Sequence, residues 1–523
     1  MANFFEHKDR RMIPNWRSFE RSTKLGELNS FQIERPSQPE EVSIDDYIYD
    51  WNKNKDIPHA ADLISAAIVN NLRGNSSVID AAKYILANES HATFSQVSLA
   101  KRIVNHQDEG DFTTHFSSLT LDVLHNLVNP EIVSTKIRET KELISAYPYN
   151  AILYVELSRL YSILGIEEKA VKAMKTALHL SIDNRFILRS ATRLFVHYQN
   201  SQKGHLNYIH SILKKSPLTV IDPWLTSAEI SISTIKNQTS KLIKKGIELI
   251  NSRNISPFNF TELASSLATV ELTNGSTKKS RGFFNKALIS PNDNSLAQIE
   301  WASKKDNQLH VNPASFPVRM NFEALALDNF HNDKFDLALD NAARWFADMP
   351  FSKRPVIFGS MLASSILKDQ SKAISFLEAG LISHHHDPLL INNLAYSLAL
   401  DNKGNEALIQ LDKIKQDTPM EPVTEICLMA TRGLALFRTG FADYGRRLYV
   451  DAIEKTRNVD DPNLNWTAIL NYAREEIRIR SEYVENVMNY VNRIPANNDE
   501  MTIRILHQDV LDMYEKFKST PNK

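Results

Sequence analysis

The chain has 523 residues, of which 42% are apolar and 24% are charged, and its formal net charge is −1. This length exceeds what one ordinary hydrophobic core supports, and the composition excludes a largely disordered chain. The near-neutral charge gives no general attraction to nucleic acid or membranes, and only 14 glycines argue against Gly-rich phosphate loops. The single Cys427 excludes an intrachain disulfide. Without an apolar run of about 20 residues or a signal-like N-terminus, we expect a cytoplasmic protein with no membrane segment.

Residues 1–43 show no helical periodicity and form an irregular aromatic and basic arm. Prolines and alternating aromatic and arginine side chains mark it: Arg10, Arg11, Pro14, Trp16, Arg17, Phe19, Arg21, Phe31, Pro36 and Pro39. Two interpretations stay open. The arm lays its aromatic rings on the first helices of the chain, or it binds a partner and becomes ordered on contact.

From Ile44 onward, apolar residues recur at helical spacing. Ala61, Ile64, Ala67 and Ile68 share one helix face, and Gly74 with Asn75 ends that pattern. Residues 44–150 therefore predict helical hairpins, although their register is too degenerate to assign to a repeat.

From residue 151 the paired helices recur in a fixed register. The segment 151–184 has large residues at positions 4, 7 and 11, small residues at positions 8, 20 and 27, and glycine at position 15. In this order they are Tyr154, Leu157 and Tyr161; Ser158, Ala170 and Ala177; and Gly165. The pattern resembles the 34-residue tetratricopeptide repeat, in which small residues let paired helices approach and large ones fill the space between them.

Further segments with this register begin at residues 185, 261, 319, 354, 388 and 426. The resemblance implies an all-α fold, an α-solenoid of tetratricopeptide-like helix-turn-helix repeats with a non-repetitive N-terminal arm. It divides the chain into the arm (1–43), degenerate hairpins (44–150), a first array (151–306), a linker or long loop (307–318), a second array (319–459) and C-terminal capping helices (460–523).

Catalytic signatures are missing from the sequence. It contains no GK[ST] phosphate loop, GxGxxG, HExxH, GxSxG or CxxC motif. The run His384-His385-His386-Asp387 is rich in metal-ligand types, but consecutive helical residues point about 100° apart and seldom converge on one ion. Histidines near a helix C-terminus are also favoured by the helix dipole. We expect no enzymatic activity, no cofactor and no metal.

The resemblance also implies which first-helix positions face the concave groove of the solenoid. Carried onto this sequence, these positions give Arg159, Arg189, Arg193, His197, Asn392 and Tyr396. Arg159 and Arg193 occupy the same position of neighbouring repeats, and guanidiniums gathered there would suit an acidic peptide, a C-terminal carboxylate or a phosphate. Solvated surface arginines explain the same residues equally well. The leading hypothesis is a scaffold or adaptor that binds a protein or peptide in this groove and belongs to a multi-protein complex.

Positive charge is concentrated in residues 201–305, which hold 14 Lys and Arg against seven Asp and Glu. Its main contributors include Lys244, Lys245, Lys278, Lys279 and Arg281. A basic stripe of this kind could follow a nucleic-acid backbone, so the alternative hypothesis is a nucleic-acid-associated or sensing subunit of a larger assembly. Lysines scattered over the solvent faces of helices explain the same excess without any ligand.

Overall fold

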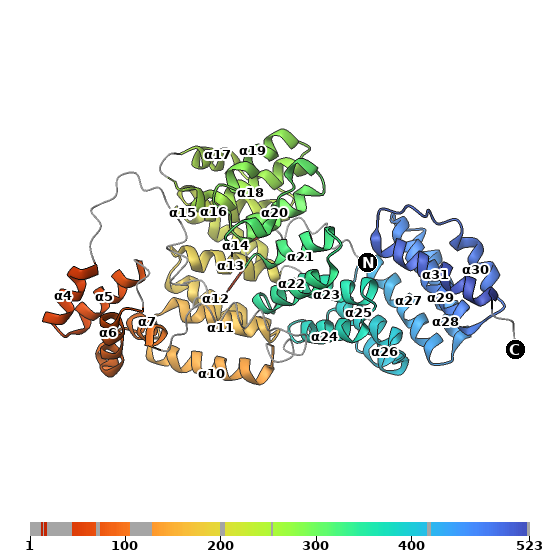
Figure 1. The fold of residues 1–523 in the computed structure, drawn as a ribbon, viewed down its shortest axis with the longest axis horizontal. Helices are drawn as coiled ribbons and strands as arrows, with labels where there is room; N and C mark the ends of the chain where they lie inside the picture. Colours follow the sequence, from red (N-terminus) through yellow and green to blue (C-terminus); the bar gives the residue numbers. More distant parts are fainter. Residues whose placement is uncertain are drawn as a thin grey trace. The chain divides into compact units, whose positions relative to one another are not determined.

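The computed structural model describes residues 12–13, 15–17, 44–69, 74–104, 128–198, 204–252, 255–318, 320–415 and 420–519 (Figure 1). Within these ranges the regular elements are helices and no strand occurs, which confirms the all-α fold. The chain divides into two compact units, one of residues Arg17–Leu119 and one of Met1–Trp16 with Thr120–Lys523. In the ranges described, no helix combines the length and the apolar character needed to cross a membrane.

The smaller unit is a cluster of short helices. In its described residues these are α4 (Ile44–Lys53), α5 (Ile57–Val69), α6 (Ser76–Ala87) and α7 (Phe94–Val104), with a 3-10 turn η2 (Glu89–His91). Their apolar faces meet around Trp51, Leu63 and Ile85, which are all 2% exposed or less. The side chain of Asn75 accepts a hydrogen bond from the Ser77 N–H and so caps α6, as expected for Asn before a helix.

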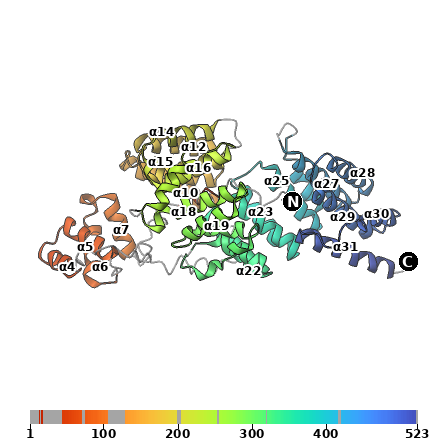
Figure 2. The ribbon, with the colours of Figure 1, turned by 90° about the horizontal axis from the view of Figure 1, so that it is seen from above.

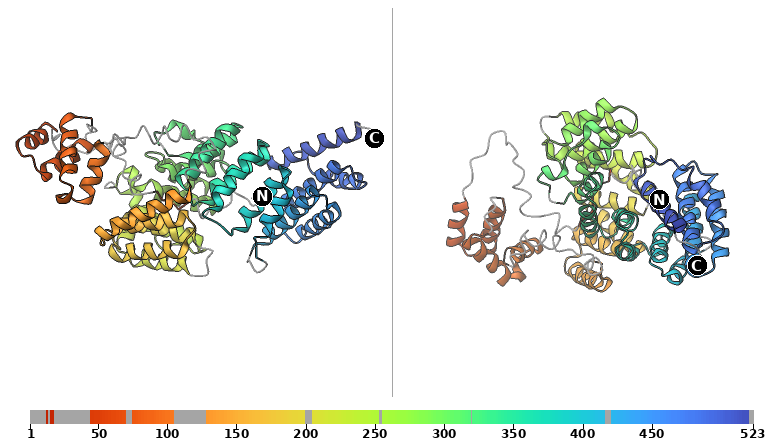
Figure 3. Two further views of the ribbon diagram at one scale, coloured as in Figure 1. Left: turned by 90° about the horizontal axis from the view of Figure 1, so that it is seen from below. Right: turned by 45° about the vertical axis from the view of Figure 1, so that its right-hand side comes forward.

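The larger unit begins with α10 (Pro130–Ala146), which packs on α11 (Figure 3). Helical hairpins follow in chain order. In the first array they are α11/α12 (Ala151–Ile163, Glu167–Leu180), α13/α14 (Arg185–His197, His205–Lys215), α16/α17 (Pro223–Ile235, Ile243–Asn251, after a short α15, Leu218–Ile221) and α18/α19 (Pro257–Thr273, Thr277–Ala287).

The helix α20 (Asp293–Ser303) is the last helix in the range predicted as the first array. The hairpins in the range predicted as the second array are α21/α22 (Phe322–His331, Phe335–Asp348), α23/α24 (Lys353–Met361, Gln370–Leu381, joined by a π-helical turn η5, Leu362–Ile366), α25/α26 (Pro388–Leu400, Gly404–Leu411) and α27/α28 (Pro422–Arg438, Ala442–Thr456). The range predicted as capping helices begins with α29/α30 (Pro462–Ile479, Val484–Val491). The helix α31 (Met501–Ser519) follows and packs on α29 (Figure 2).

Small residues sit where the two helices of a hairpin touch. Ser158, Ala170 and Ala177 are all 0% exposed, and the Ser158 hydroxyl donates to the Ala170 carbonyl at 2.8 Å. Gly165 forms the turn with φ +66°, a conformation that residues with a Cβ rarely adopt. The local chemistry that the repeat pattern predicts is therefore present, and the hairpins are tetratricopeptide-like.

The hairpins also stack in layers. The first helices α11, α13, α16, α18 and α20 each contact the next one, and so do α25, α27 and α29. This arrangement buries apolar faces that no single hairpin could bury alone, which is the basis of a repeat solenoid.

One repeat unit is incomplete. The helix α20 is followed by a connection with only two 3-10 turns, η3 (Asn307–Leu309) and η4 (Pro313–Ser315), before α21 begins. Leu309 anchors this connection, because it is 3% exposed and packs in the same apolar cluster as Trp301 of α20. The connection covers the segment 307–318 that the sequence predicts as a linker or long loop.

Candidate peptide-binding surface

A short piece of the N-terminal arm is buried in the larger unit. Met12, Ile13 and Trp16 are only 1%, 2% and 3% exposed, although charged and polar residues surround them in the sequence. Their partners lie more than 200 residues further along the chain. The described piece of the arm therefore packs on helices of the larger unit, which differs from the interpretation that its aromatic rings lie on the first helices of the chain. Of the residues that mark the arm in the sequence, Trp16 and Arg17 are described, and the others fall outside the described ranges.

Met12 contacts the first helices of two neighbouring hairpins. Its side chain belongs to the apolar cluster that includes Ile230 of α16 and Leu263 of α18. The hydroxyl of Ser231 lies 3.3 Å from the Met12 carbonyl oxygen and 2.8 Å from the Ser227 carbonyl oxygen of its own helix, so its one proton is shared between the two. A side chain thus approaches a backbone carbonyl of a segment that lies outside any described helix.

Asn15 and Trp16 contact two later elements. The Asn15 side-chain amide donates to Asp293 Oδ2 at the start of α20, at 2.9 Å. The Trp16 backbone N–H donates to Met349 Sδ at 3.3 Å, and the Trp16 ring packs edge-on against Phe351, with centroids 5.4 Å apart. We call the residues that hold the segment, Ile230, Ser231, Asp293, Met349 and Phe351, the arm-binding surface.

Phe351 joins this surface to the first array. Its ring lies 5.3 Å from that of His197 at the end of α13, and the His384 ring lies 5.2 Å from His197. His384 Nε2 donates to the Phe351 carbonyl at 2.9 Å, whereas His385 Nε2 donates to the Leu164 carbonyl at 3.1 Å. His384 thus contacts the first array through its ring against His197, and His385 does so through its hydrogen bond to Leu164.

A buried carboxylate lies beside the surface. Glu262 is 2% exposed, accepts from Arg189 Nη2 at 2.7 Å and accepts from the Asn292 amide at 2.9 Å. Burial raises the pKa of Glu262 to about 7; the Asp293 charge adds to this and the Arg189 charge opposes it. Because Asp293 also holds Asn15, the arm and this carboxylate share one electrostatic environment.

Of the four groove residues expected in the first array, two lie next to this surface. His197 contacts Phe351, and the Arg189 guanidinium stacks 4.3 Å from the centre of the Trp224 ring besides pairing with Glu262. Arg159 is turned to Glu156 one helical turn earlier at 2.5 Å, with 12% of its side chain exposed. Arg193 is 6% exposed. The arginines therefore do not form an open cluster ready for an acidic ligand.

Asn392 and Tyr396 belong to another part of the second array. Both lie on α25; Asn392 is 5% exposed, and the Tyr396 hydroxyl hydrogen-bonds to Asn471 Oδ1 of α29 at 2.9 Å. They contact neither Met12 nor Trp16, and their role in partner binding stays a prediction.

The basic residues of the alternative hypothesis lie on the second helices α17 and α19. Lys244, Lys278 and Lys279 are exposed. Lys245 lies 3.3 Å from Glu248 and Arg281 lies 2.6 Å from Asp306, and the Arg281 hydrogen bond lowers the pKa of Asp306. Two of the five cations are thus ion-paired although their side chains are partly exposed, and whether any of the five contacts nucleic acid stays a prediction.

The arm-binding surface was not predicted from the sequence. A signal was available, because the segment Met12–Trp16 reads MIPNW and places three large apolar side chains inside a charged arm. Its partners Asp293, Met349 and Phe351 carry no mark of this role, since each is an ordinary residue of its repeat.

No family model and no curated protein matches the sequence. Among solved structures, yeast Tom70 is similar at 14% identity with a TM-score of 0.28, over 79% of this chain and 96% of that one. The APC/C hetero-tetramer Cut9-Hcn1 gives 11% identity and a TM-score of 0.32, over 91% and 97%. Naa15/Naa10 bound to HypK-THB gives 12% identity and 0.26, over 89% and 94%. The hairpin packing of this chain, rather than these similarities, makes it a tetratricopeptide-like helical-repeat protein.

Proposed function

We propose that this chain is a non-enzymatic scaffold or adaptor whose arm-binding surface holds an extended peptide segment with apolar and aromatic side chains. The observation that supports this most directly is the burial of Met12, Ile13 and Trp16 against helices far along the chain. The chain's own arm is then a model of the ligand. A protein partner would present a similar segment, and the arm would compete with it.

The chemistry of the surface favours such a ligand. Ile230 and its cluster offer apolar contacts, Phe351 offers an aromatic ring, Asp293 offers an acceptor, and the Ser231 hydroxyl offers a donor that it shares with the Ser227 carbonyl. Extended peptides are commonly bound through main-chain hydrogen bonds together with pockets for particular side chains. An acidic ligand, by contrast, gains little here, because Arg189 is already paired with Glu262.

The arm has an advantage over any free partner because it is tethered. Because the arm and the surface belong to one chain, docking of the arm is intramolecular, so a free partner of weak affinity would bind poorly while the arm is docked. Weakening the arm should therefore expose the surface to a peptide supplied in solution.

Binding of a free arm peptide to a chain with a weakened arm tests the proposal. The full-length variant M12S/W16A is mixed with a fluorescent peptide of residues 8–20, and binding is followed by fluorescence anisotropy. We expect saturable binding to the variant, at least tenfold weaker binding to the wild-type chain, and loss of binding when the peptide itself carries W16A. The variant Y149A, which removes an 86% exposed ring, should behave as wild type.

The proposal fails if the variant keeps its helical circular dichroism and still does not bind the peptide. It also fails if the peptide carrying W16A binds equally well, because binding would then not depend on the Trp16 pocket.

A nucleic-acid role remains the second proposal, supported by the exposed Lys244, Lys278 and Lys279. These lysines lie on α17 and α19. The two helices are joined at their C-terminal ends, where Lys286 Nζ of α19 donates to Asn251 Oδ1 of α17 at 2.5 Å. If this proposal holds, the wild-type chain binds single-stranded RNA or DNA, and this binding weakens steeply as the salt concentration rises. The variant K244E/K245E/K278E/K279E should not bind either nucleic acid. Wild-type chain that binds neither RNA nor DNA at 50 mM salt would exclude this role.

A further inference from the structure

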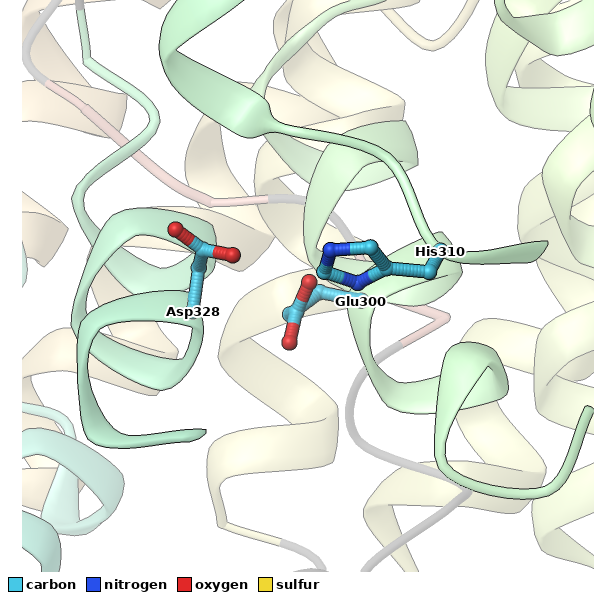
Figure 4. A group of neighbouring side chains, drawn as sticks. All are labelled: Glu300, His310 and Asp328. Carbon is cyan, nitrogen blue, oxygen red and sulfur yellow. The ribbon is translucent and has the colours of Figure 1, made fainter. Parts of the chain in front are cut away.

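Three potential metal ligands gather at the incomplete repeat. Ligand atoms of Glu300, His310 and Asp328 all lie within 4.8 Å of one another (Figure 4). Glu300 comes from α20, His310 follows η3 in the connection, and Asp328 comes from α21. The three side chains therefore meet from three consecutive elements of the chain.

Glu300 is the buried member of the group. Its side chain is 0% exposed, and its Oε1 accepts from His331 Nδ1 at 2.8 Å. Its Oε2 is buried and has no hydrogen-bond partner among the described residues. A buried carboxylate oxygen without a partner is costly, and a cation bound to it would remove that cost.

Asp328 adds a second negative charge beside Glu300. Asp328 is half-buried and accepts from the Asn332 amide at 3.1 Å, a neutral donor that offsets none of its charge. Lys304 lies within the electrostatic field of Glu300, but it also faces Glu500. The imidazoles of His310 and His331 also lie in the field of Asp328, and one ammonium group shared with Glu500 does not offset the charge of both carboxylates.

We propose that Glu300, His310 and Asp328 bind a divalent first-row transition-metal ion such as Zn²⁺. One imidazole and two carboxylates form a donor set suited to such ions, whereas Ca²⁺ and Mg²⁺ prefer oxygen ligands alone. Metal–ligand bonds of about 2.0–2.2 Å place two donors on one ion at most about 4.4 Å apart, so only small side-chain adjustments are needed. The hydrogen bond from His331 would orient the Glu300 carboxylate, as outer ligands commonly do.

The position of the site gives the ion a structural role. Leu309 already anchors the connection to α20 through its apolar contact, and His310 is the next residue. An ion bound to Glu300, His310 and Asp328 would tie this connection to α20 and α21 together. It would do so at the one place in the described repeats where a first helix lacks its second helix.

The experiment uses the untagged full-length chain after treatment with a chelator. Zn²⁺ is titrated by calorimetry and by competition with a chromophoric chelator, and thermal unfolding is recorded with and without the metal. We expect one Zn²⁺ per chain with micromolar affinity or better, a rise in Tm on binding, and no competition by millimolar Ca²⁺. The variants H310A and D328N should each lose at least tenfold in affinity together with the Tm rise.

Two variants serve as matched controls. H386A removes an exposed histidine from the His384–His386 run, and D62N removes an exposed carboxylate from α5 of the smaller unit. Both should bind Zn²⁺ as the wild-type chain does. The proposal is overturned if the wild-type chain binds no stoichiometric Zn²⁺, if H310A and D328N bind it unchanged, or if H386A alone abolishes binding.

Discussion

The Trp16 ring packs edge-on against the Phe351 ring, with centroids 5.4 Å apart and an interplanar angle of 63°. Phe351 contacts His197 in turn, so one tryptophan lies at the contact between the two arrays. Replacing Trp16 by Ala should therefore lower the free energy of unfolding by about 3–5 kcal/mol, as for other buried large-to-small changes. Urea unfolding followed by circular dichroism measures this loss. The control Y149A should shift the same curve by less than about 0.5 kcal/mol.

Gly165 tests the contact between the arrays. It has φ +66°, and a Cβ added there would lie 2.8 Å from the Ser383 carbonyl oxygen. Gly204 has the same φ, but no atom of the described residues lies within 4 Å of such a Cβ. Alanine at this position therefore measures only the free-energy cost of the left-handed backbone conformation. We expect G204A to destabilise by about 1 kcal/mol and G165A by about 1–3 kcal/mol more, measured by urea unfolding. Equal losses of unfolding free energy in G165A and G204A would mean that the close approach of Gly165 to the Ser383 carbonyl does not matter for stability.

The Arg438–Glu475 pair is a buried ion pair between α27 and α29. Arg438 donates to both Glu475 oxygens, at 2.7 and 2.8 Å, and their side chains are 9% and 0% exposed. R438A should cost about 3 kcal/mol or more, because it leaves a buried carboxylate with fewer donors. The control R432A breaks a pair with Asp412 that is 41% and 66% exposed, and it should cost less than about 1 kcal/mol. Denaturant midpoints and slopes for the two variants provide the comparison.

Glu262 should make stability depend on pH. Burial raises its pKa from 4.5 to about 7, so between these values the folded chain holds a proton that the unfolded chain has released. Its contribution is fully present below about pH 4.5 and is lost as the pH rises to about 7, a change of at most about 3 kcal/mol. The variant E262Q should lack this dependence, whereas E248Q, at a carboxylate that is 55% exposed, should keep it. Urea unfolding at pH steps from 4 to 8 would detect the difference, and identical pH profiles for E262Q and wild type would contradict it.

The hairpins could be predicted from the sequence because their determinants are local. Ser158, Ala170 and Ala177 lie within one repeat, and the structure buries all three completely where the helices touch. A turn glycine and a small residue act within a few tens of residues, which is the range that a repeat pattern describes.

The candidate sites depend on distant contacts, which the repeat register does not describe. Asn15 and Asp293 are 278 residues apart, and Arg189 and Glu262 are 73 residues apart. The register correctly places Arg189 on a first helix, but it cannot reveal that a later helix supplies a buried carboxylate for it. Glu300, His310 and Asp328 likewise follow no ligand spacing, because a loop and two helices bring them together.

The docking of the arm also orders events during synthesis. Met12 and Trp16 leave the ribosome long before Met349 and Phe351, to which Trp16 binds. At roughly 5–20 residues per second, translation of the intervening residues takes on the order of 20–70 seconds. Ile230 and Leu263, which Met12 covers in the folded chain, are synthesised within that interval. The nascent chain therefore passes through a period in which its surface and its own ligand are separate.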